Sequence, residues 1–275
     1  MNIDFHYFVT YLMFTGLGYT PEDSGLIANA AQYVDDNTMR VVIDKGRPTE
    51  YRTVSTFSID LAEKPATRHL TYAFHFSPSD PFEGDPLDDP FRRKDGKSQS
   101  TITTPGNKFA AEMVREAFAT GSLYEFGIAL HTYQDTFAHG GFCGHDSGLN
   151  AVTVPGCSKY HHLSTMGHAQ AGHTTDLVVN WRDDRFVHGN INNHERHLAG
   201  LRATAELIYA LRYPVPTCNA SVTPDTIDIY QENKKSCIEH IVNDIGIAMM
   251  EPPDIVHAGN RELKKYKNKN GRQYA

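Results

Sequence analysis

The sequence predicts a mainly α-helical protein, a single helical-bundle domain with a small β-hairpin excursion. Long stretches such as residues 191–211 and 224–250 repeat apolar residues at the spacing of a helix face. Several of these stretches open with a capping residue or a proline, as helices do. Neither a repeat nor a linker divides residues 1–260, so we predict one metal-binding helical domain there and a basic C-terminal tail over 261–275.

The first two predicted helices bring acidic groups to helix ends. Residues 3–14 form an aromatic-rich helix with Asp4 and His6 at its start. Thr20-Pro21-Glu22-Asp23 opens the second helix with an N-cap, a proline and two acids at the positive end of the dipole. That helix runs to about residue 33, and Asp35 and Asp36 follow at its negative end. Carboxylates are unfavourable at that end of the helix dipole, and a bound cation would offset the unfavourable interaction. Both residues are therefore candidate metal ligands.

The pattern changes between residues 39 and 59. β-Branched residues there flank Lys45-Gly46-Arg47-Pro48, which predicts a β-hairpin or an extended excursion. His75 follows, and residues 77–104, rich in Pro, Asp, Lys and Ser, predict a long loop. Loops of this length often serve as lids or binding segments.

Thr104-Pro105 is predicted to open the next helix, which Gly121 ends. Ser122 then caps a central helix over 123–141, and the helices over 191–211 and 224–250 are interpreted as packing helices. The helix after Thr104 should bury one stripe of apolar residues, namely Phe109, Met113, Val114, Ala117 and Phe118.

The central helix contains His131, Asp135 and His139 at a spacing of four residues. Each such step turns about 40° around the axis, so the three side chains share one face. They could be solvated polar residues, but apolar and aromatic neighbours favour a metal site for one ion or a pair. Gly127, one turn earlier, is expected to leave this face open for something bulky.

Composition narrows the function classes. Seven of the 15 histidines lie between residues 131 and 173, and histidine is the commonest metal ligand. The net charge of −7 does not favour long nucleic acids as partners. No stretch reaches the ~18 apolar residues of a membrane span, and without a signal peptide we expect a cytoplasmic protein. Cys143 and Cys157 could form a disulfide bond, although nothing in the sequence requires one.

The candidate ligands lie at helix ends or on one helix face, and a helical bundle could bring them together in its core. Histidine with aspartate suits zinc, manganese or iron, and a bridging carboxylate would hold two ions and generate hydroxide at neutral pH. The candidates are Asp4, His6, Asp35, Asp36, His75, His131, Asp135, His139, His168, His173 and Asp176.

The segment HTYQDTFAH resembles the core motif of the zinc-dependent phospholipase C and single-strand-specific nuclease superfamily. The resemblance extends to DFHY, QYVDD and GH…GH..D, covers about the first two thirds of the chain, and includes uncharacterised bacterial relatives of that superfamily. It implies an all-α fold of the zinc phospholipase C type with a trinuclear zinc cluster. In that superfamily the N-terminal amine and a Trp carbonyl bind one ion, whereas here the chain begins Met1-Asn2 and its one Trp is Trp181.

The resemblance implies three metal positions in this sequence. Asp135 would bridge the first and third ions, and Asp135 and Asp36 are the candidate catalytic carboxylates. His168 and His173 compete for one place at the second ion. The first ion would be bound by Asp35, His75, His131 and Asp135, the second by His139, His168 and Asp176, and the third by His6 with Asp4.

The implied activity is a metal-dependent hydrolase in which activated hydroxide attacks a phosphoester, with two or three Zn²⁺ ions, or Mn or Fe in their place. The substrate could be a lipid, a nucleotide or another small molecule, and the oligomeric state stays open. Tyr133 and Arg182 are candidates for phosphate contact, and His145, His161 and His162 for the pocket lining.

Two alternatives remain. One is a His/carboxylate dinuclear iron enzyme, although the sequence lacks the Glu-x-x-His motif of its usual form. The other is a non-catalytic binding protein in which metals staple helices together and the loop 77–104 binds a partner.

Overall fold

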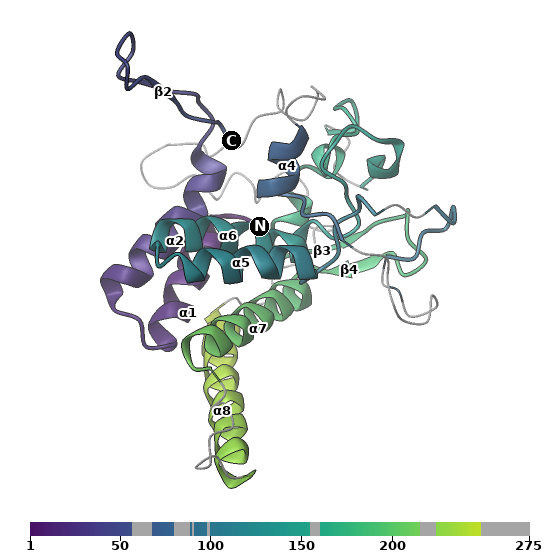
Figure 1. Ribbon diagram of the computed structural model, residues 1–275. Coiled ribbons are helices and arrows are strands. Elements are labelled where there is room, and N and C mark those ends of the chain that lie inside the picture. The colour runs from purple at the N-terminus through teal and green to yellow at the C-terminus, as the bar shows by residue number, and fades with distance from the viewer. Residues whose placement is uncertain are drawn as a thin grey trace, which may run out of the picture.

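The computed structural model describes residues 1–56, 68–79, 89, 91–97, 100–154, 160–214 and 224–248. Over these residues helices predominate, and the sheets are two antiparallel strand pairs (Figure 1). The predicted fold class, mainly α with a small hairpin, is confirmed. The basic tail 261–275, Cys157, the end of the excursion and part of the loop 77–104 lie outside the described residues.

The N-terminal helices form as the capping signals indicate. A π-helical turn, η1 (Asp4–Val9), continues into α1 (Thr10–Gly16). Helix α2 (Pro21–Asp36) begins where the Thr20 side chain accepts a hydrogen bond from the Asp23 N–H at 3.1 Å. The chain then forms the hairpin of β1 (Val42–Ile43) and β2 (Tyr51–Arg52), with Val42 opposite Arg52 and Ile43 opposite Tyr51. Helix α4 (Arg68–Phe74) leads into His75.

Helix α5 (Lys108–Ala119) begins later than predicted. Asn107, rather than Thr104, caps it by accepting the Ala110 N–H, and Gly106 adopts a positive φ of 63° just before it. The buried side of α5 also differs from the prediction: Val114 is in the core as predicted, but the prediction for Phe109 was wrong, because 69% of it is exposed. Ala110 and Ala111 form the buried side in its place.

Helix α6 (Leu123–Ala138) is the central element and packs against α2, α5 and α7 (Figure 1). Ser122 caps it as predicted, and His139 is the residue immediately after its end. At Gly127 a Cβ atom would run into the Ile27 carbonyl oxygen and lie 2.7 Å from the Ala30 Cβ. The face next to Gly127 is therefore filled by the backbone of α2 itself, which brings the end of α2 close to the face of α6 that carries the candidate ligands.

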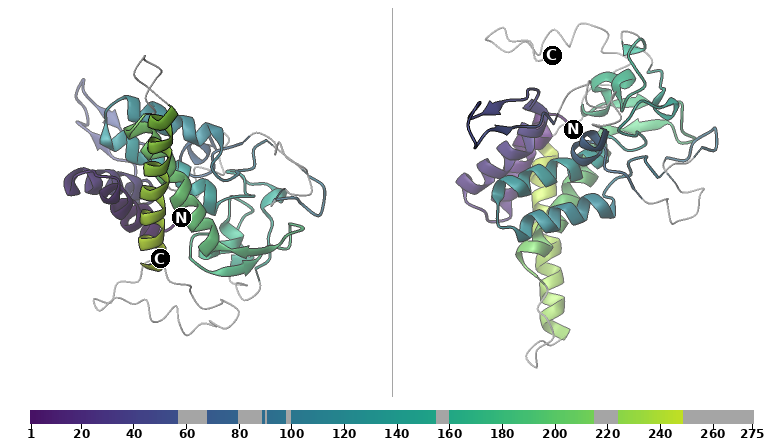
Figure 2. Two further views of the ribbon diagram at one scale, coloured as in Figure 1. Left: turned by 90° about the horizontal axis from the view of Figure 1, so that it is seen from below. Right: turned by 45° about the horizontal axis from the view of Figure 1, so that its top comes forward.

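The remaining helices are α7 (Asn193–Arg212) and α8 (Pro224–Ala248), which pack on each other and complete the main apolar core. Beside this bundle lies a loop-rich region with the helical turns η2 (Gly148–Asn150) and η4 (Ala169–Thr175) and the strands β3 (Asn180–Arg182) and β4 (Asn190–Asn192) (Figures 1 and 2). Its own apolar cluster includes Phe142 and Trp181. Among the described helices, none is long and apolar enough to cross a membrane.

Candidate metal centre

Asp135 is the centre of the cluster of candidate ligands. It projects from α6 into the protein interior, where its side chain is almost completely buried. Its Oδ2 lies 3.1 Å from both His75 Nδ1 and His131 Nε2, and its Oδ1 lies 3.1 Å from His6 Nε2. One carboxylate therefore faces imidazoles from η1, the end of α4 and α6.

Asp35 and Asp176 add carboxylates on either side of Asp135. The Asp35 oxygens lie 3.6 Å from His131 Nε2 and 4.0 Å from His6 Nε2. Three groups of ligand atoms are close enough together for a metal ion, and they are His6 with Asp35 and His131, His75 with His131 and Asp135, and His139 with His168 and Asp176. The structure thus brings together the eight residues predicted as metal ligands, and their binding of metal stays a prediction.

The third group lies where α6 ends and the loop-rich region begins. His139 Nε2 is 3.0 Å from Asp176 Oδ1, and His168 Nε2 is 3.7 Å from Asp176 Oδ2. Gly172, in a positive-φ conformation, bends the chain between His168 and Asp176 so that both reach His139. His139 Nδ1 is also 3.5 Å from Asp135 Oδ2, which connects this group to the other two.

Most of the histidines use one ring nitrogen to bond a carbonyl oxygen. A carbonyl oxygen can only accept, so the nitrogen facing it must carry the proton. His6 donates from Nδ1 to Gln134 Oε1 at 3.0 Å, and His75 from Nε2 to the Thr56 carbonyl at 3.0 Å. His139 and His168 donate from Nδ1 to the carbonyls of His75 and Gly172 at 2.8 and 2.9 Å. In each ring the other nitrogen faces the carboxylates.

The amino group of Met1 lies inside the same cluster. It forms an ion pair with Asp135 Oδ1 and lies 3.5 Å from Asp176 Oδ1. Burial lowers the pKa of this amino group, but attraction to Asp135, Asp176 and Asp35 outweighs burial and raises the pKa to about 10. The cluster therefore accommodates a positive charge between its carboxylates.

Burial and mutual attraction set the charge states of the candidate ligands. Burial lowers the pKa of His131 and of His168 to about 4 and also lowers the pKa of His6. Burial would raise the pKa of Asp135, but His139, the amino group and His131 hold it well below the usual range. At neutral pH these three imidazoles are thus neutral and Asp135 is ionised.

One edge of the cluster is open to solvent. The Asp35 side chain is 25% exposed and the His168 side chain 21%, whereas the side chains of His6, His75, His131, Asp135 and His139 are buried. Among the described residues, the exposed edge of the cluster therefore lies at the last turn of α2 and at residue 168.

Several predicted site residues lie elsewhere. Asp36, predicted as catalytic, is exposed and accepts a hydrogen bond from Gln32, because the helix turns it about 100° away from Asp35. Asp4 and His173 are also exposed, so His168 takes the contested place beside Asp176. Tyr133 packs in the apolar core and Arg182 pairs with Asp184 at 2.6 Å on the surface, and neither is at the cluster.

The loop histidines predicted as pocket lining belong to none of the three groups. His145 bonds the Tyr72 hydroxyl, His161 is partly buried and His162 is exposed.

Two buried residues near the cluster were not predicted from the sequence. Gln134 holds His6 and donates to Thr10 Oγ1 at 2.9 Å; its position next to Asp135 was the only available signal. His197 on α7 is almost completely buried, and neither of its ring nitrogens has a hydrogen-bond partner among the described residues. Burial lowers its pKa to about 3. Its neighbours in the sequence gave no sign of this.

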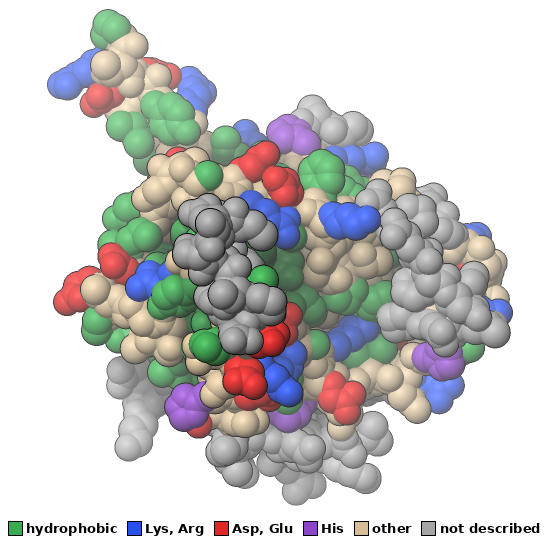
Figure 3. All heavy atoms as spheres, turned by 60° about the horizontal axis from the view of Figure 1, so that its bottom comes forward, with side chains coloured by type: hydrophobic (Ala, Val, Ile, Leu, Met, Phe, Trp, Pro, Cys, Tyr) green, Lys and Arg blue, Asp and Glu red, His purple; other side chains and the backbone are tan. Residues whose placement is uncertain are grey.

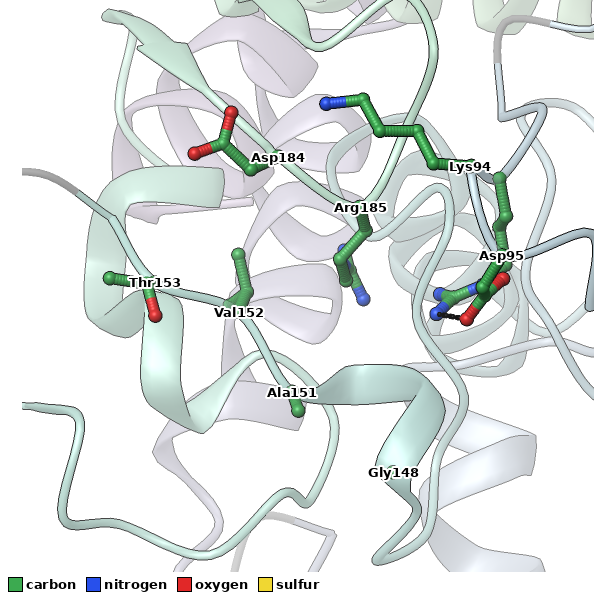
Figure 4. A pocket seen from close by; sticks show the side chains of 9 residues that line it. Lys94, Asp95, Gly148, Ala151, Val152, Thr153, Asp184 and Arg185 are labelled. Carbon is green, nitrogen blue, oxygen red and sulfur yellow. Dashed lines mark hydrogen bonds and ion pairs between the residues drawn. The ribbon is translucent and has the colours of Figure 1, made fainter.

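A separate polar pocket of about 500 Å³ opens in the loop-rich region (Figure 4). Arg93, Lys94 and Arg185 line it together with Asp95 and Asp184. Arg185 is held by Asp183, with Nη2 donating to Oδ2 at 2.6 Å, and its guanidinium lies 3.9 Å from the centre of the Phe142 ring. None of the eight candidate ligands is among the described residues that line this pocket.

Fold and site together define a mainly helical protein with a buried cluster of candidate metal ligands. The chain belongs to a family described as "Family of unknown function (DUF6765)", whose match spans residues 1–270. Comparison with curated proteins gave no match, and comparison with solved structures gave none either.

Proposed function

We propose that the protein is a metal-dependent hydrolase that cleaves a phosphoester at a di- or trinuclear zinc site built from the eight clustered residues. The observation that carries this proposal is the orientation of the imidazoles around Asp135. Four rings donate their outer N–H to a carbonyl oxygen, the arrangement that fixes metal-binding histidines. Their inner nitrogens then face carboxylate oxygens.

This arrangement is unfavourable without a cation between the partners. A neutral ring that donates from Nδ1 has a lone pair at Nε2, and in His6 that atom lies 3.1 Å from Asp135 Oδ1. His75 donates from Nε2 to the Thr56 carbonyl, so its lone pair is at Nδ1, which lies 3.1 Å from Asp135 Oδ2. Lone pairs facing each other across buried space favour a cation between them. The Met1 amino group supplies one at Asp135 Oδ1, and a metal ion is the cation that would also bind the imidazole nitrogens.

The donor set fits zinc. Imidazole nitrogens and carboxylate oxygens are common zinc ligands, and Asp135 offers one oxygen to His6 and the other to His75 and His131. A carboxylate used in this way is suited to bridging two ions. The resemblance of the HTYQDTFAH segment to the zinc phospholipase C and nuclease superfamily supports the same assignment.

When bound, zinc ions supply a nucleophile at neutral pH and polarise a phosphoryl oxygen. The protein's contribution is to hold the ligands: Gln134 fixes the His6 ring and the Thr56 carbonyl fixes His75. Attraction to His139 and to the amino group keeps Asp135 ionised despite its burial. The exposed edge at Asp35 and His168 gives a substrate access, which favours a catalytic site over a closed structural one.

The test compares two neighbouring carboxylates. Asp35→Asn and Asp36→Asn change adjacent residues at the end of α2, but only Asp35 belongs to the cluster. We expect the zinc content of the purified protein, measured by elemental mass spectrometry, to fall in Asp35→Asn and to stay at the wild-type value in Asp36→Asn. Equal loss in both variants, or a wild-type protein that binds no metal after zinc is added, would refute the metal site.

The second measurement is hydrolysis of bis(p-nitrophenyl) phosphate by the zinc-loaded protein. We expect turnover that EDTA abolishes and that Asp35→Asn lowers on the order of a hundredfold or more. A protein that binds zinc but leaves this diester and its monoester unchanged would be a metal-stapled binding protein, and stoichiometric iron in place of zinc would point to oxidative chemistry.

A further inference from the structure

The β1–β2 hairpin exposes apolar side chains that the helical bundle does not explain. It projects from the end of α2, away from α5, α7 and α8 (Figures 1 and 2). Ile43 and Tyr51 are opposite each other in the antiparallel pair, so their side chains point to the same face. Ile43 is 48% exposed and Tyr51 is 61% exposed. Together they form an apolar outer face.

The other face of the hairpin has a partner. Val42 and Arg52 are opposite each other and, with Arg40, Val41, Thr53 and Val54, line a groove of about 310 Å³ against His69 and Leu70 of α4. The groove covers this face in part, since Val42 and Val54 remain 37% and 43% exposed, and Ile43 and Tyr51 are not among its lining residues. Contiguous exposed apolar side chains on a soluble surface are characteristic of binding sites.

Charge indicates what would bind there. Residues 39–54 contain the cations Arg40, Lys45, Arg47 and Arg52 against the anions Asp44 and Glu50, an excess of two positive charges in a chain of net charge −7. Figure 3 shows the hairpin as a knob at the upper left where apolar and basic side chains lie together with a few acidic ones. Apolar side chains with an aromatic ring and adjacent basic residues match the interface of an anionic lipid bilayer.

We propose that the outer face of the β1–β2 hairpin docks on an anionic phospholipid membrane, with Ile43 and Tyr51 inserted among the headgroups and Lys45 and Arg47 beside the lipid phosphates. A second copy of the chain fits less well, because two-fold pairing would place two positively charged hairpins against each other.

The base of the hairpin connects this surface to the candidate metal centre. Asn37 Nδ2 donates to the Val54 carbonyl at 2.8 Å, and Thr56 Oγ1 donates to the Val34 carbonyl at 2.6 Å. The Thr56 carbonyl in turn accepts a hydrogen bond from His75 Nε2, and Asp35 is in the last turn of α2. A docked hairpin would therefore hold the exposed edge of the candidate centre near the membrane surface. The docking itself does not depend on the proposed hydrolase activity.

The experiment is sedimentation of the full-length chain with vesicles of phosphatidylcholine alone or mixed with phosphatidylglycerol. We expect binding to the anionic vesicles that high salt weakens, and little binding to phosphatidylcholine. Ile43→Ser combined with Tyr51→Ser should weaken binding on the order of tenfold, and Lys45→Gln with Arg47→Gln should lower its salt dependence.

The matched control is Phe109→Ser combined with Tyr124→Ser. Tyr124 is 61% exposed, the same as Tyr51, but Phe109 and Tyr124 lie on α5 and α6. This control should bind vesicles like the wild type, and all variants should keep the wild-type zinc content, which separates a failure here from a failure of the metal site. Absence of binding to anionic vesicles, equal loss in the control, or a hairpin-dependent dimer in light scattering would overturn the proposal.

Discussion

The candidate metal centre and the β1–β2 hairpin depart from ordinary folding in opposite directions. The centre buries the carboxylates of Asp135 and Asp176 inside a helical bundle, where ionised groups are costly. The hairpin does the reverse and leaves Ile43 and Tyr51 in water, where apolar groups gain nothing. Residues of the same types are placed conventionally elsewhere, as Ile27 in the core and Asp184 on the surface show.

This contrast indicates which parts of the molecule serve binding and which serve stability. A bundle optimised only for stability would replace buried ion pairs with apolar packing and cover the exposed face. The two regions are also connected to each other through α2 and Thr56. Experiments that change one region and not the other can break or sharpen this comparison.

The largest effect we expect is acid unfolding of the metal-free protein through its buried histidines. Burial lowers the pKa of His131 and His168 to about 4 and that of His197 to about 3, against 6.5 when the chain is unfolded. Between these values the unfolded chain binds more protons, so stability falls as pH drops from about 6.5 to 4. The shifts correspond to at most about 3 kcal/mol each for His131 and His168 and about 5 kcal/mol for His197.

Urea unfolding followed by circular dichroism at a series of pH values measures this loss. Added zinc should move the acid transition to lower pH, because it binds only neutral imidazole and the folded state. A free energy of unfolding that is unchanged between pH 7 and 4 would contradict the buried neutral histidines.

The next largest effect concerns Asp135. Asp135→Asn removes the charge that faces the amino group and three imidazoles, and breaking such a buried pair costs about 3–5 kcal/mol. We expect both a lower free energy of unfolding and loss of bound zinc. Asp183→Asn is the control, because it breaks the buried pair with Arg185 in the loop-rich region. It should destabilise the protein but retain the zinc, and zinc loss in both variants would show that metal content merely follows stability.

A smaller effect is expected where α2 meets α6. Gly127→Ala would press a Cβ against the α2 backbone at Ile27 and should cost about 1–3 kcal/mol. Gly25→Ala on α2 has open space around its Cβ and should stabilise the protein by roughly 0.5–1 kcal/mol. Thermal unfolding of the two variants compares them directly. Similar melting temperatures would mean that α2 does not approach α6 this closely.

This contact also explains how far the sequence could predict the site. Spacing along α6 and carboxylates at the end of α2 are local signals, so His131, Asp135 and Asp35 could be selected from the sequence. Whether Asp35 or Asp36 faces α6 depends on the rotation of α2 about its own axis where it packs against Gly127 of α6. No local sequence pattern encodes that rotation. The choice of His168 over His173 likewise depends on the bend at Gly172.

The fold prediction also succeeded where the signal was local and failed where it was not. Capping residues located α2 and α6 well, because a cap is a contact between neighbours in the chain. The start of α5 was misplaced because Gly106 and Asn107 compete with Thr104-Pro105 as a helix opening. The hairpin was predicted from β-branched residues, but the exposure of its outer face follows from the position of α4, which lies against the opposite face.

The smallest effect is expected for the hairpin variant Ile43→Ser with Tyr51→Ser. These side chains leave little apolar surface to lose on unfolding, so the free energy of unfolding should change by no more than about 0.5 kcal/mol in the absence of lipid. Urea unfolding measures it beside Asp135→Asn. A cost comparable with that of Asp135→Asn would mean that the outer face packs against the protein and is no docking surface. A negligible change in the free energy of unfolding, together with loss of vesicle binding, would show that the outer face contributes to binding and not to stability.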